Sequence, residues 1–192
     1  GPQLIGRVDL AQGEWLPDLH VFELLGETAR SGVWDVLAAA DGRIYFTTYF
    51  ESAGSVDPAT GEVLRFETLG PGLNELVEGP AGSILASRYG AADGSNGSVL
   101  WFTPAGELIA EHLLEGPRDV LIAAKSVAFD ARRRQIWVNT DLVPRGGGPV
   151  RHDARVLDLF GRELDRVEQP EIQFMTFGAD GTHYRVELLG RR

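Results

Sequence analysis

Four polar side chains could do chemistry because they stand beside the starts of apolar segments at matching places along the chain: Asp35, Asn74, Glu75 and Lys125. Carboxylate and amide oxygens can hold Ca²⁺ in flexible geometry or orient a polar ligand. An ammonium group beside them would either form an internal ion pair or repel a cation. The chain has no cysteine, so thiolate nucleophiles and Cys-ligated metal centres are excluded.

The overall charge argues against a nucleic-acid partner. The 192 residues include 28 acidic and 18 basic side chains, for a formal net charge of −10, and so lack the excess of Lys and Arg that neutralises a phosphate backbone. No apolar run approaches the roughly 20 residues of a membrane span. We therefore expect a small molecule or another protein as the partner, with no nucleic acid and no membrane span. The absence of cysteine and the single lysine favour a periplasmic or secreted location.

Two repeated units must position these side chains. The first is a strand, a tight turn with glycine, and a second strand; it occupies residues 6–14, 54–62, 97–107 and 154–163. Glycine at positions 13, 61, 106 and 161 supplies the positive φ that such a turn needs. The second unit is an apolar strand, a turn and another strand, and it alternates with the first over residues 33–47, 73–87, 126–139 and 172–186.

The spacing of these units predicts an all-β fold of the β-propeller type. Equivalent positions in the second unit, Ile44, Ile84, Ile136 and His183, are 40, 52 and 47 residues apart, which is typical of four-stranded propeller blades. The second unit forms the inner strand pair of each blade and the first forms the outer pair. Residues 1–192 then make a single propeller domain or a propeller fragment, with half a blade, three full antiparallel blades and a second half.

The two predicted halves raise the question of how the ring closes. We expect residues 4–22 to pair with residues 172–186, in the same chain or a neighbouring one, because unpaired halves leave open sheet edges. Three arrangements stay open: a fragment of a larger ring, a four-bladed ring, or a partial ring completed by another copy as a homo-oligomer. The fragment or shortened ring is the favoured interpretation.

The blade sequences resemble a known superfamily. Residues 33–35, 41–46 and 54–62 are similar to a blade of the SMP-30/gluconolactonase and NHL-type propellers. The resemblance implies six or seven blades in complete members and a divalent cation, often Ca²⁺, held at one channel mouth by Glu, Asn and Asp. Asp35, Asn74 and Glu75 occupy the corresponding places here, whereas Lys125 departs from the pattern. The related streptogramin lyases would need a histidine base in the channel, and we interpret the four histidines of this chain as structural or solvent-exposed.

We therefore predict a non-catalytic propeller that binds a small ligand or a protein partner at the channel mouth or loops. The alternative is a Ca²⁺-dependent lactonase or esterase, and no catalytic residue is assigned. Asp35, Asn74 and Glu75 should face the channel on adjacent blades, and Lys125 should neutralise them as an ion pair. The recurrent aromatic residues should pack between blades, with Tyr49 or Tyr89 near the channel rim; they are Trp34, Tyr45, Phe46, Tyr49, Trp101, Phe102, Phe129, Trp137, Phe174 and Phe177.

Overall fold

The computed structural model describes residues 5–9, 11–19, 33–48, 53–90, 94–169, 172–178 and 180–187. These residues form antiparallel strands, with one short 3₁₀ turn, η1 (Pro80–Gly82). Within the described ranges no helix has the length and apolar character needed to span a bilayer. The all-β prediction is confirmed.

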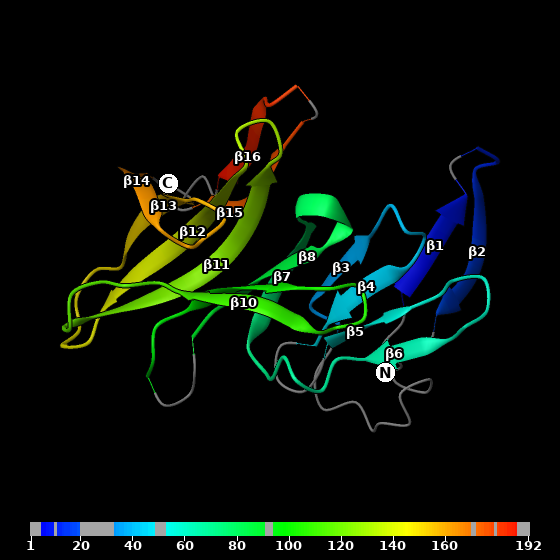
Figure 1. Ribbon diagram of the computed structural model, residues 1–192, viewed down its shortest axis with the longest axis horizontal. Helices are drawn as coiled ribbons and strands as arrows, with labels where there is room; N and C mark the ends of the chain where they lie inside the picture. The colour runs from blue at the N-terminus through cyan, green and yellow to red at the C-terminus, as the bar shows by residue number, and fades with distance from the viewer. Residues whose placement is uncertain are drawn as a thin grey trace.

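The strands are grouped in sheets that follow one another in chain order (Figure 1). Three four-stranded sheets are named blades I, II and III, and a two-stranded half-blade precedes and follows them. The N-terminal half-blade consists of β1 (Ile5–Asp9) and β2 (Glu14–Leu19). Blade I consists of β3 (Asp35–Ala38), β4 (Ile44–Thr47), β5 (Ala53–Val56) and β6 (Val63–Arg65).

Blades II and III continue the same pattern. Blade II consists of β7 (Leu73–Glu78), β8 (Ile84–Arg88), β9 (Ser98–Phe102) and β10 (Leu108–Leu113). Blade III consists of β11 (Val120–Asp130), β12 (Gln135–Pro144), β13 (Arg151–Leu157) and β14 (Glu163–Glu168). The C-terminal half-blade consists of β15 (Ile172–Phe177) and β16 (His183–Glu187). The predicted arrangement of half, three and half is therefore confirmed.

The first strand of each blade is the innermost one. In space β7 lies beside β3 and β11, and β11 lies beside β15, so these four strands share one axis. Each blade then extends outward from this axis through hydrogen-bonded neighbours. The residues that begin the inner strands consequently meet at one end of the axis, as the repeat predicted.

The two half-blades do not combine into one blade within this chain. β1–β2 and β15–β16 are separate sheets, and Figure 1 shows them at opposite ends of the row of blades. The reason is packing: Ile5 and Leu19 of the N-terminal half-blade cluster with Phe46 and Val56 of blade I, whereas β15 lies beside β11 of blade III. Three blades therefore stand between the halves, and the described residues do not show the halves paired within this chain; pairing with a neighbouring chain stays a prediction.

Buried aromatic and aliphatic side chains hold neighbouring blades together. Tyr45, Phe66 and Phe102 belong to one cluster that joins blades I and II, and the Phe66 and Phe102 rings meet edge to face at 5.7 Å. Burying a large apolar side chain stabilises the fold by about 1.5–3 kcal/mol. The prediction of a core position is confirmed for Tyr45, Phe46 and Phe102, which are at most 1% exposed.

The outer turns have the glycine geometry that the repeat predicted. All four glycines have positive φ, between 70° and 84°; they are Gly13, Gly61, Gly106 and Gly161. In blade I the Gly61 amide donates to the Asp57 carbonyl at 2.8 Å, and the Asp57 amide donates to the Glu62 carbonyl at 2.9 Å. The turn is thus closed by backbone hydrogen bonds that need the left-handed conformation at Gly61.

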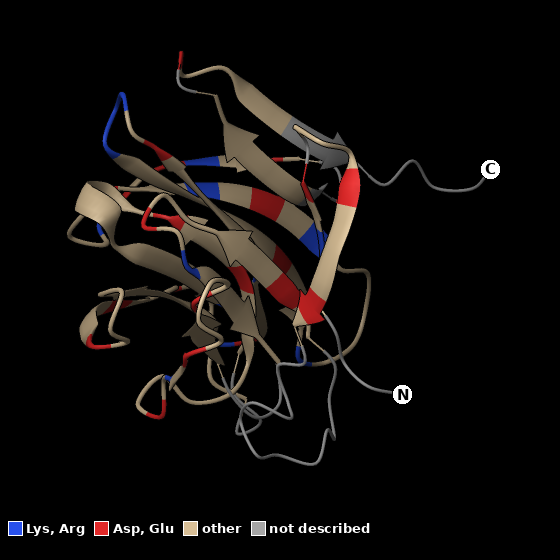
Figure 2. Cartoon of the chain, turned by 90° about the vertical axis from the view of Figure 1, so that its right-hand side faces the viewer, with Lys and Arg blue, Asp and Glu red and all other residues tan. Residues whose placement is uncertain are grey.

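Charged residues are interspersed over the molecule. On the side shown in Figure 2, acidic residues are spread over strands and turns, and Lys and Arg residues do not form one continuous basic face. A phosphate-binding surface requires clustered Lys and Arg side chains. Among the residues drawn as described, this side shows short basic stretches, one of them at a hairpin tip, and no continuous basic face.

Candidate functional site

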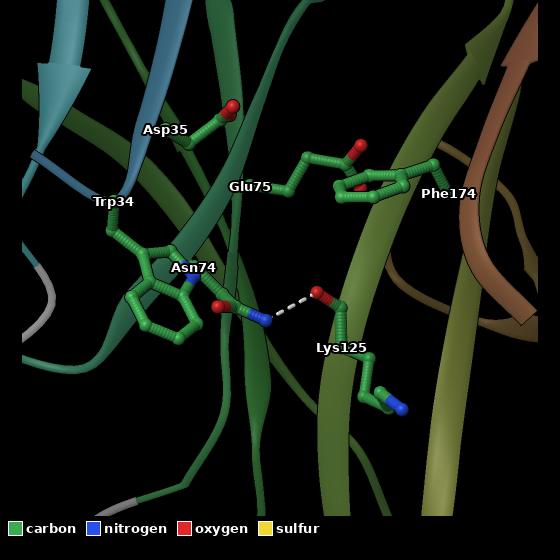
Figure 3. A pocket seen from close by; sticks show the side chains of 6 residues that line it. All are labelled: Trp34, Asp35, Asn74, Glu75, Lys125 and Phe174. Atoms are coloured by element: carbon green, nitrogen blue, oxygen red, sulfur yellow. Dashed lines mark hydrogen bonds between the residues drawn. The ribbon is translucent and has the colours of Figure 1, made fainter.

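A cavity of about 260 Å³ lies where the inner strands begin. We call it the mouth cavity; it is lined by Trp34, Asp35, Asn74, Glu75, Lys125 and Phe174 (Figure 3). The lining residues come from blades I, II and III and from the C-terminal half-blade. The structure thus brings together Asp35, Asn74, Glu75 and Lys125, as their equivalent places in the repeat predicted.

Both carboxylates of the cavity connect adjacent inner strands. Asp35 Oδ2 accepts a hydrogen bond from the Leu76 amide at 2.7 Å, and Glu75 Oε2 accepts one from the Val127 amide at 2.9 Å. An inner strand has a blade neighbour on one side only, so amides on its other edge need partners from elsewhere. Asp35 therefore joins blade I to blade II, and Glu75 joins blade II to blade III.

Asn74 is held in one orientation by a neighbouring backbone. Its Nδ2 donates to the Lys125 carbonyl, which also accepts a hydrogen bond from Ser87 Oγ at 3.2 Å. Turning the amide over would place its oxygen against that carbonyl, so the contact fixes which end faces the cavity. Asn74 Oδ1 is buried and has no hydrogen-bond partner within the described residues. A buried acceptor without a partner is costly, and a ligand that donates to it would remove the cost.

The Lys125 ammonium is held on the blade III side of the cavity. The pairing of β11 with β12 shifts between Ala124 and Ser126, so Lys125 stands at a bulge. Its Nζ lies 3.6 Å from Asp141 Oδ2, and Asp141 Oδ1 lies 2.7 Å from His152 Nδ1. Figure 3 shows the Lys125 side chain pointing away from Asp35 and Glu75. The ion pair described for Lys125 is therefore with Asp141, whereas the sequence suggested the carboxylates of the mouth.

Burial changes the protonation of the cavity. Desolvation, together with the nearby Asp35 carboxylate, raises the pKa of Glu75 to about 8. Burial also raises the pKa of Asp35, against the lowering effect of its backbone hydrogen bonds. At neutral pH the Glu75 carboxyl is therefore largely protonated and can donate a hydrogen bond.

The residues of the mouth do not fit the Ca²⁺ site that the family resemblance implied. Asp35 and Glu75 each accept a backbone amide from a different neighbouring strand, and the protonated Glu75 carboxyl is a poor cation ligand. Within the described ranges, no three His, Asp or Glu side chains are grouped as a metal site. Asp35 and Glu75 are therefore engaged in hydrogen bonds between blades.

Two aromatic residues that sequence analysis assigned to the core line this cavity instead. Trp34 is 62% exposed and Phe174 is 52% exposed. Trp34 directly precedes β3, and Phe174 is the third residue of β15. Figure 3 shows the two rings on opposite sides of the view, with Asn74 and Glu75 between them. The place of Trp34 directly before an inner strand is the signal that could have identified it, whereas Phe174, inside β15, has no such signal.

The two tyrosines predicted at the rim have different outcomes. Tyr49 lies outside the described residues. Tyr89 follows β8 and is not among the residues that line the mouth cavity. Its amide donates to the Gly72 carbonyl at 3.0 Å, and its carbonyl accepts from the Ala124 amide at 3.2 Å. The backbone of Tyr89 thus links blades II and III outside the cavity.

The opposite ends of the inner strands form a different kind of hollow. It has a volume of about 460 Å³ and is lined mainly by apolar residues, including Leu37, Val77, Phe129 and Phe177. Its acidic residue, Glu78, accepts a hydrogen bond from the Ala40 amide. Of these two hollows on the axis, the mouth cavity therefore has more polar lining residues.

Comparison with known proteins identifies the fold. No protein-family model and no curated protein matches the sequence. Among solved structures, the luciferin-regenerating enzyme is similar with a TM-score of 0.59 and 13% identity, over 100% of this chain and 64% of that protein. The Dos1 propeller is similar with a TM-score of 0.58 and 12% identity, over 93% of this chain and 46% of that protein.

A designed protein is also similar. The computationally designed Ika8 protein has a TM-score of 0.50 and 15% identity, over 84% of this chain and 48% of that protein. This chain therefore spans less than two thirds of each of these three structures. At such low identity the likeness shows the fold alone, which is that of a β-propeller.

Proposed function

We propose that this protein is a non-catalytic propeller-type binding module whose mouth cavity takes a small neutral ligand with a flat face and a hydrogen-bond donor. The observation that carries the proposal is the combination of Asn74 Oδ1, buried without a partner, with the two exposed rings of Trp34 and Phe174. A concave site with apolar walls and a few directed polar groups is typical of small-molecule binding.

The chemistry of the cavity defines the ligand class. Aromatic rings favour flat apolar surfaces that can stack against them. Asn74 Oδ1 needs an N–H or O–H donor, and the protonated Glu75 carboxyl offers a donor to a ligand oxygen. A planar ring that bears an amide or hydroxyl group can stack on the aromatic rings, donate to Asn74 Oδ1 and accept from the Glu75 carboxyl. The concave shape favours such a molecule over a protein partner.

The alternative, a Ca²⁺-dependent lactonase or esterase, has less support. It requires ionised oxygen ligands directed at one point, whereas Asp35 and Glu75 hold backbone amides of two different strands. The raised pKa of Glu75 further weakens cation binding at neutral pH. Calorimetric titration with CaCl₂ tests this alternative directly: micromolar binding that is lost in Asn74→Ala would establish it and refute the binding-module proposal.

Ligand-observed NMR with neutral ring amides, beginning with nicotinamide, tests the proposed function. We expect saturation transfer to the wild type and its loss in Trp34→Ala. Trp15→Ala is the matched control, because Trp15 is 79% exposed on the N-terminal half-blade. If no member of the panel binds, or if both variants bind as the wild type does, the mouth cavity is not the proposed site.

A further inference from the structure

A third cavity, of about 290 Å³, lies on blade III and shares no lining residue with the mouth cavity. We call it the blade III cavity. Its apolar wall contains Pro117, which precedes β11, with Val120 and Leu142. Its polar lining includes Arg151, Asp153 and Glu168. The cavity therefore offers opposite charges and an apolar surface to the same small space.

Asp153 is a buried acceptor that is incompletely satisfied. The residue is 2% exposed, and its Oδ1 accepts a hydrogen bond from Thr140 Oγ1. Its Oδ2 is buried without a hydrogen-bond partner in the described part of the chain. Two guanidinium groups lie near the carboxylate: Arg166 Nε is 3.7 Å from Oδ2, and Arg155 Nε is 3.5 Å from Oδ1. An oxygen of this kind requires a donor, and the cavity beside it is the space from which a donor can approach.

Glu168 adds a second negative charge at the same place. It stands directly opposite Asp153 in the pairing of β13 with β14. Two like charges in direct cross-strand register destabilise a sheet. Arg166, which also lines the cavity, lies 3.7 Å from Asp153 Oδ2, and a further cation beside Glu168 would offset the second negative charge. Glu168 has no ion pair among the described residues. The pair is thus suited to an ammonium group.

Arg151 provides the opposite charge on the same face of the sheet. It pairs in register with Leu142 of β12 and lies two residues before Asp153 along β13. Its guanidinium is exposed and has no described ion-pair partner, so it is available to a carboxylate. A guanidinium binds a carboxylate with two parallel hydrogen bonds.

We propose that the blade III cavity binds a free α-amino acid with an aliphatic side chain. The ammonium group lies between Asp153 Oδ2 and Glu168, the carboxylate lies on Arg151, and the side chain lies against Val120 and Leu142. This site is independent of the mouth cavity and of the function proposed for it.

Isothermal titration calorimetry of the full chain with L-leucine at pH 7 tests the proposal. We expect saturable binding, with 3-methylbutylamine and 4-methylpentanoate each at least about tenfold weaker because each lacks one of the two charged groups. Saturation by the amine or the acid at the same concentration as L-leucine would refute the zwitterion assignment. The absence of heat with L-leucine would refute the site.

Variants locate the binding. Glu168→Gln and Arg151→Gln should each weaken L-leucine binding at least about tenfold. Both positions are exposed, so the fold should persist, and circular dichroism verifies this. The matched controls Glu107→Gln and Arg134→Gln make the same changes at exposed positions elsewhere and should bind as the wild type does. Equal weakening in the controls, or none in the cavity variants, overturns the proposal.

Discussion

Glu75 should make the stability of this protein fall as pH rises. Its pKa is raised from an ordinary value of 4.5 to about 8 in the folded protein, mainly because the carboxyl is buried and also because Asp35 is near. Between pH 4.5 and about pH 8, the folded state therefore keeps a proton that the unfolded state has already released. Stability from this group is lost progressively above pH 4.5 and is fully lost above about pH 8.

The size of the effect follows from the two pKa values. Each pH unit between them changes the free energy of unfolding by about 1.4 kcal/mol, so the loss between pH 5 and pH 8 is about 3–4 kcal/mol. Glu75→Gln removes the ionisation and keeps an oxygen that can accept the Val127 amide. The variant should therefore be close to the wild type at pH 5 and more stable by about 3–4 kcal/mol at pH 8.

Urea unfolding at pH 5, 6, 7 and 8 measures the difference between the two proteins, and other titrating groups cancel in that difference. Glu107→Gln is the control, because Glu107 is exposed in the turn between β9 and β10. A difference between wild type and Glu75→Gln that stays constant with pH would show that Glu75 is ionised in the folded protein. The assignment of a neutral mouth cavity would then fail.

Three further changes have defined outcomes. Asp35→Asn should lower the pKa of Glu75 because it removes a neighbouring negative charge. NMR titration of the Glu75 side-chain carboxyl measures this pKa, and an unchanged or higher value would show that the Asp35 charge does not raise it. Gly61→Val should lower the free energy of unfolding in urea by about 1–3 kcal/mol, because φ at Gly61 is +75°. Gly146→Val is the control, since Gly146 lies in open space without a positive φ, and it should change this free energy little. Equal decreases in the two variants would show that the backbone conformation of Gly61 is not the cause. Phe102→Ala should lower the free energy of unfolding by about 3–5 kcal/mol, since the ring is 1% exposed, and a loss below about 1 kcal/mol would place the ring outside the core.

The blade pattern could be predicted because turns are local. A glycine such as Gly61 determines the shape of its own turn, and the spacing of turns then determines where strands begin. Asp35 and Glu75 occupy equivalent places in consecutive repeats. The spacing of the repeats was therefore sufficient to predict that the two residues converge. Their meeting in the mouth cavity follows from that periodicity.

The contacts that differ from expectation depend on distant parts of the chain. The ion pair of Lys125 with Asp141 requires the bulge in β11 and the register of β12, neither of which follows from the residues around Lys125. Trp34 has the same chemical character as the buried Phe46, but its exposure depends on whether a neighbouring blade covers it. Closure likewise depends on how the half-blades pack, which local sequence does not specify.

The carboxylates of the mouth illustrate how one residue pattern can serve structure or ligand binding. In a propeller blade the inner edge of the first strand faces the axis, so its amides lack the ladder partners that outer strands receive. Asp35 and Glu75 meet this need by accepting amides of the next blade at 2.7 and 2.9 Å. These hydrogen bonds between blades give acidic residues at inner-strand starts a structural role. The group left unsatisfied is Asn74 Oδ1, an amide oxygen that accepts from a neutral donor as readily as from a charged one. In the proposed function it is this atom that would determine which ligand groups the mouth cavity accepts.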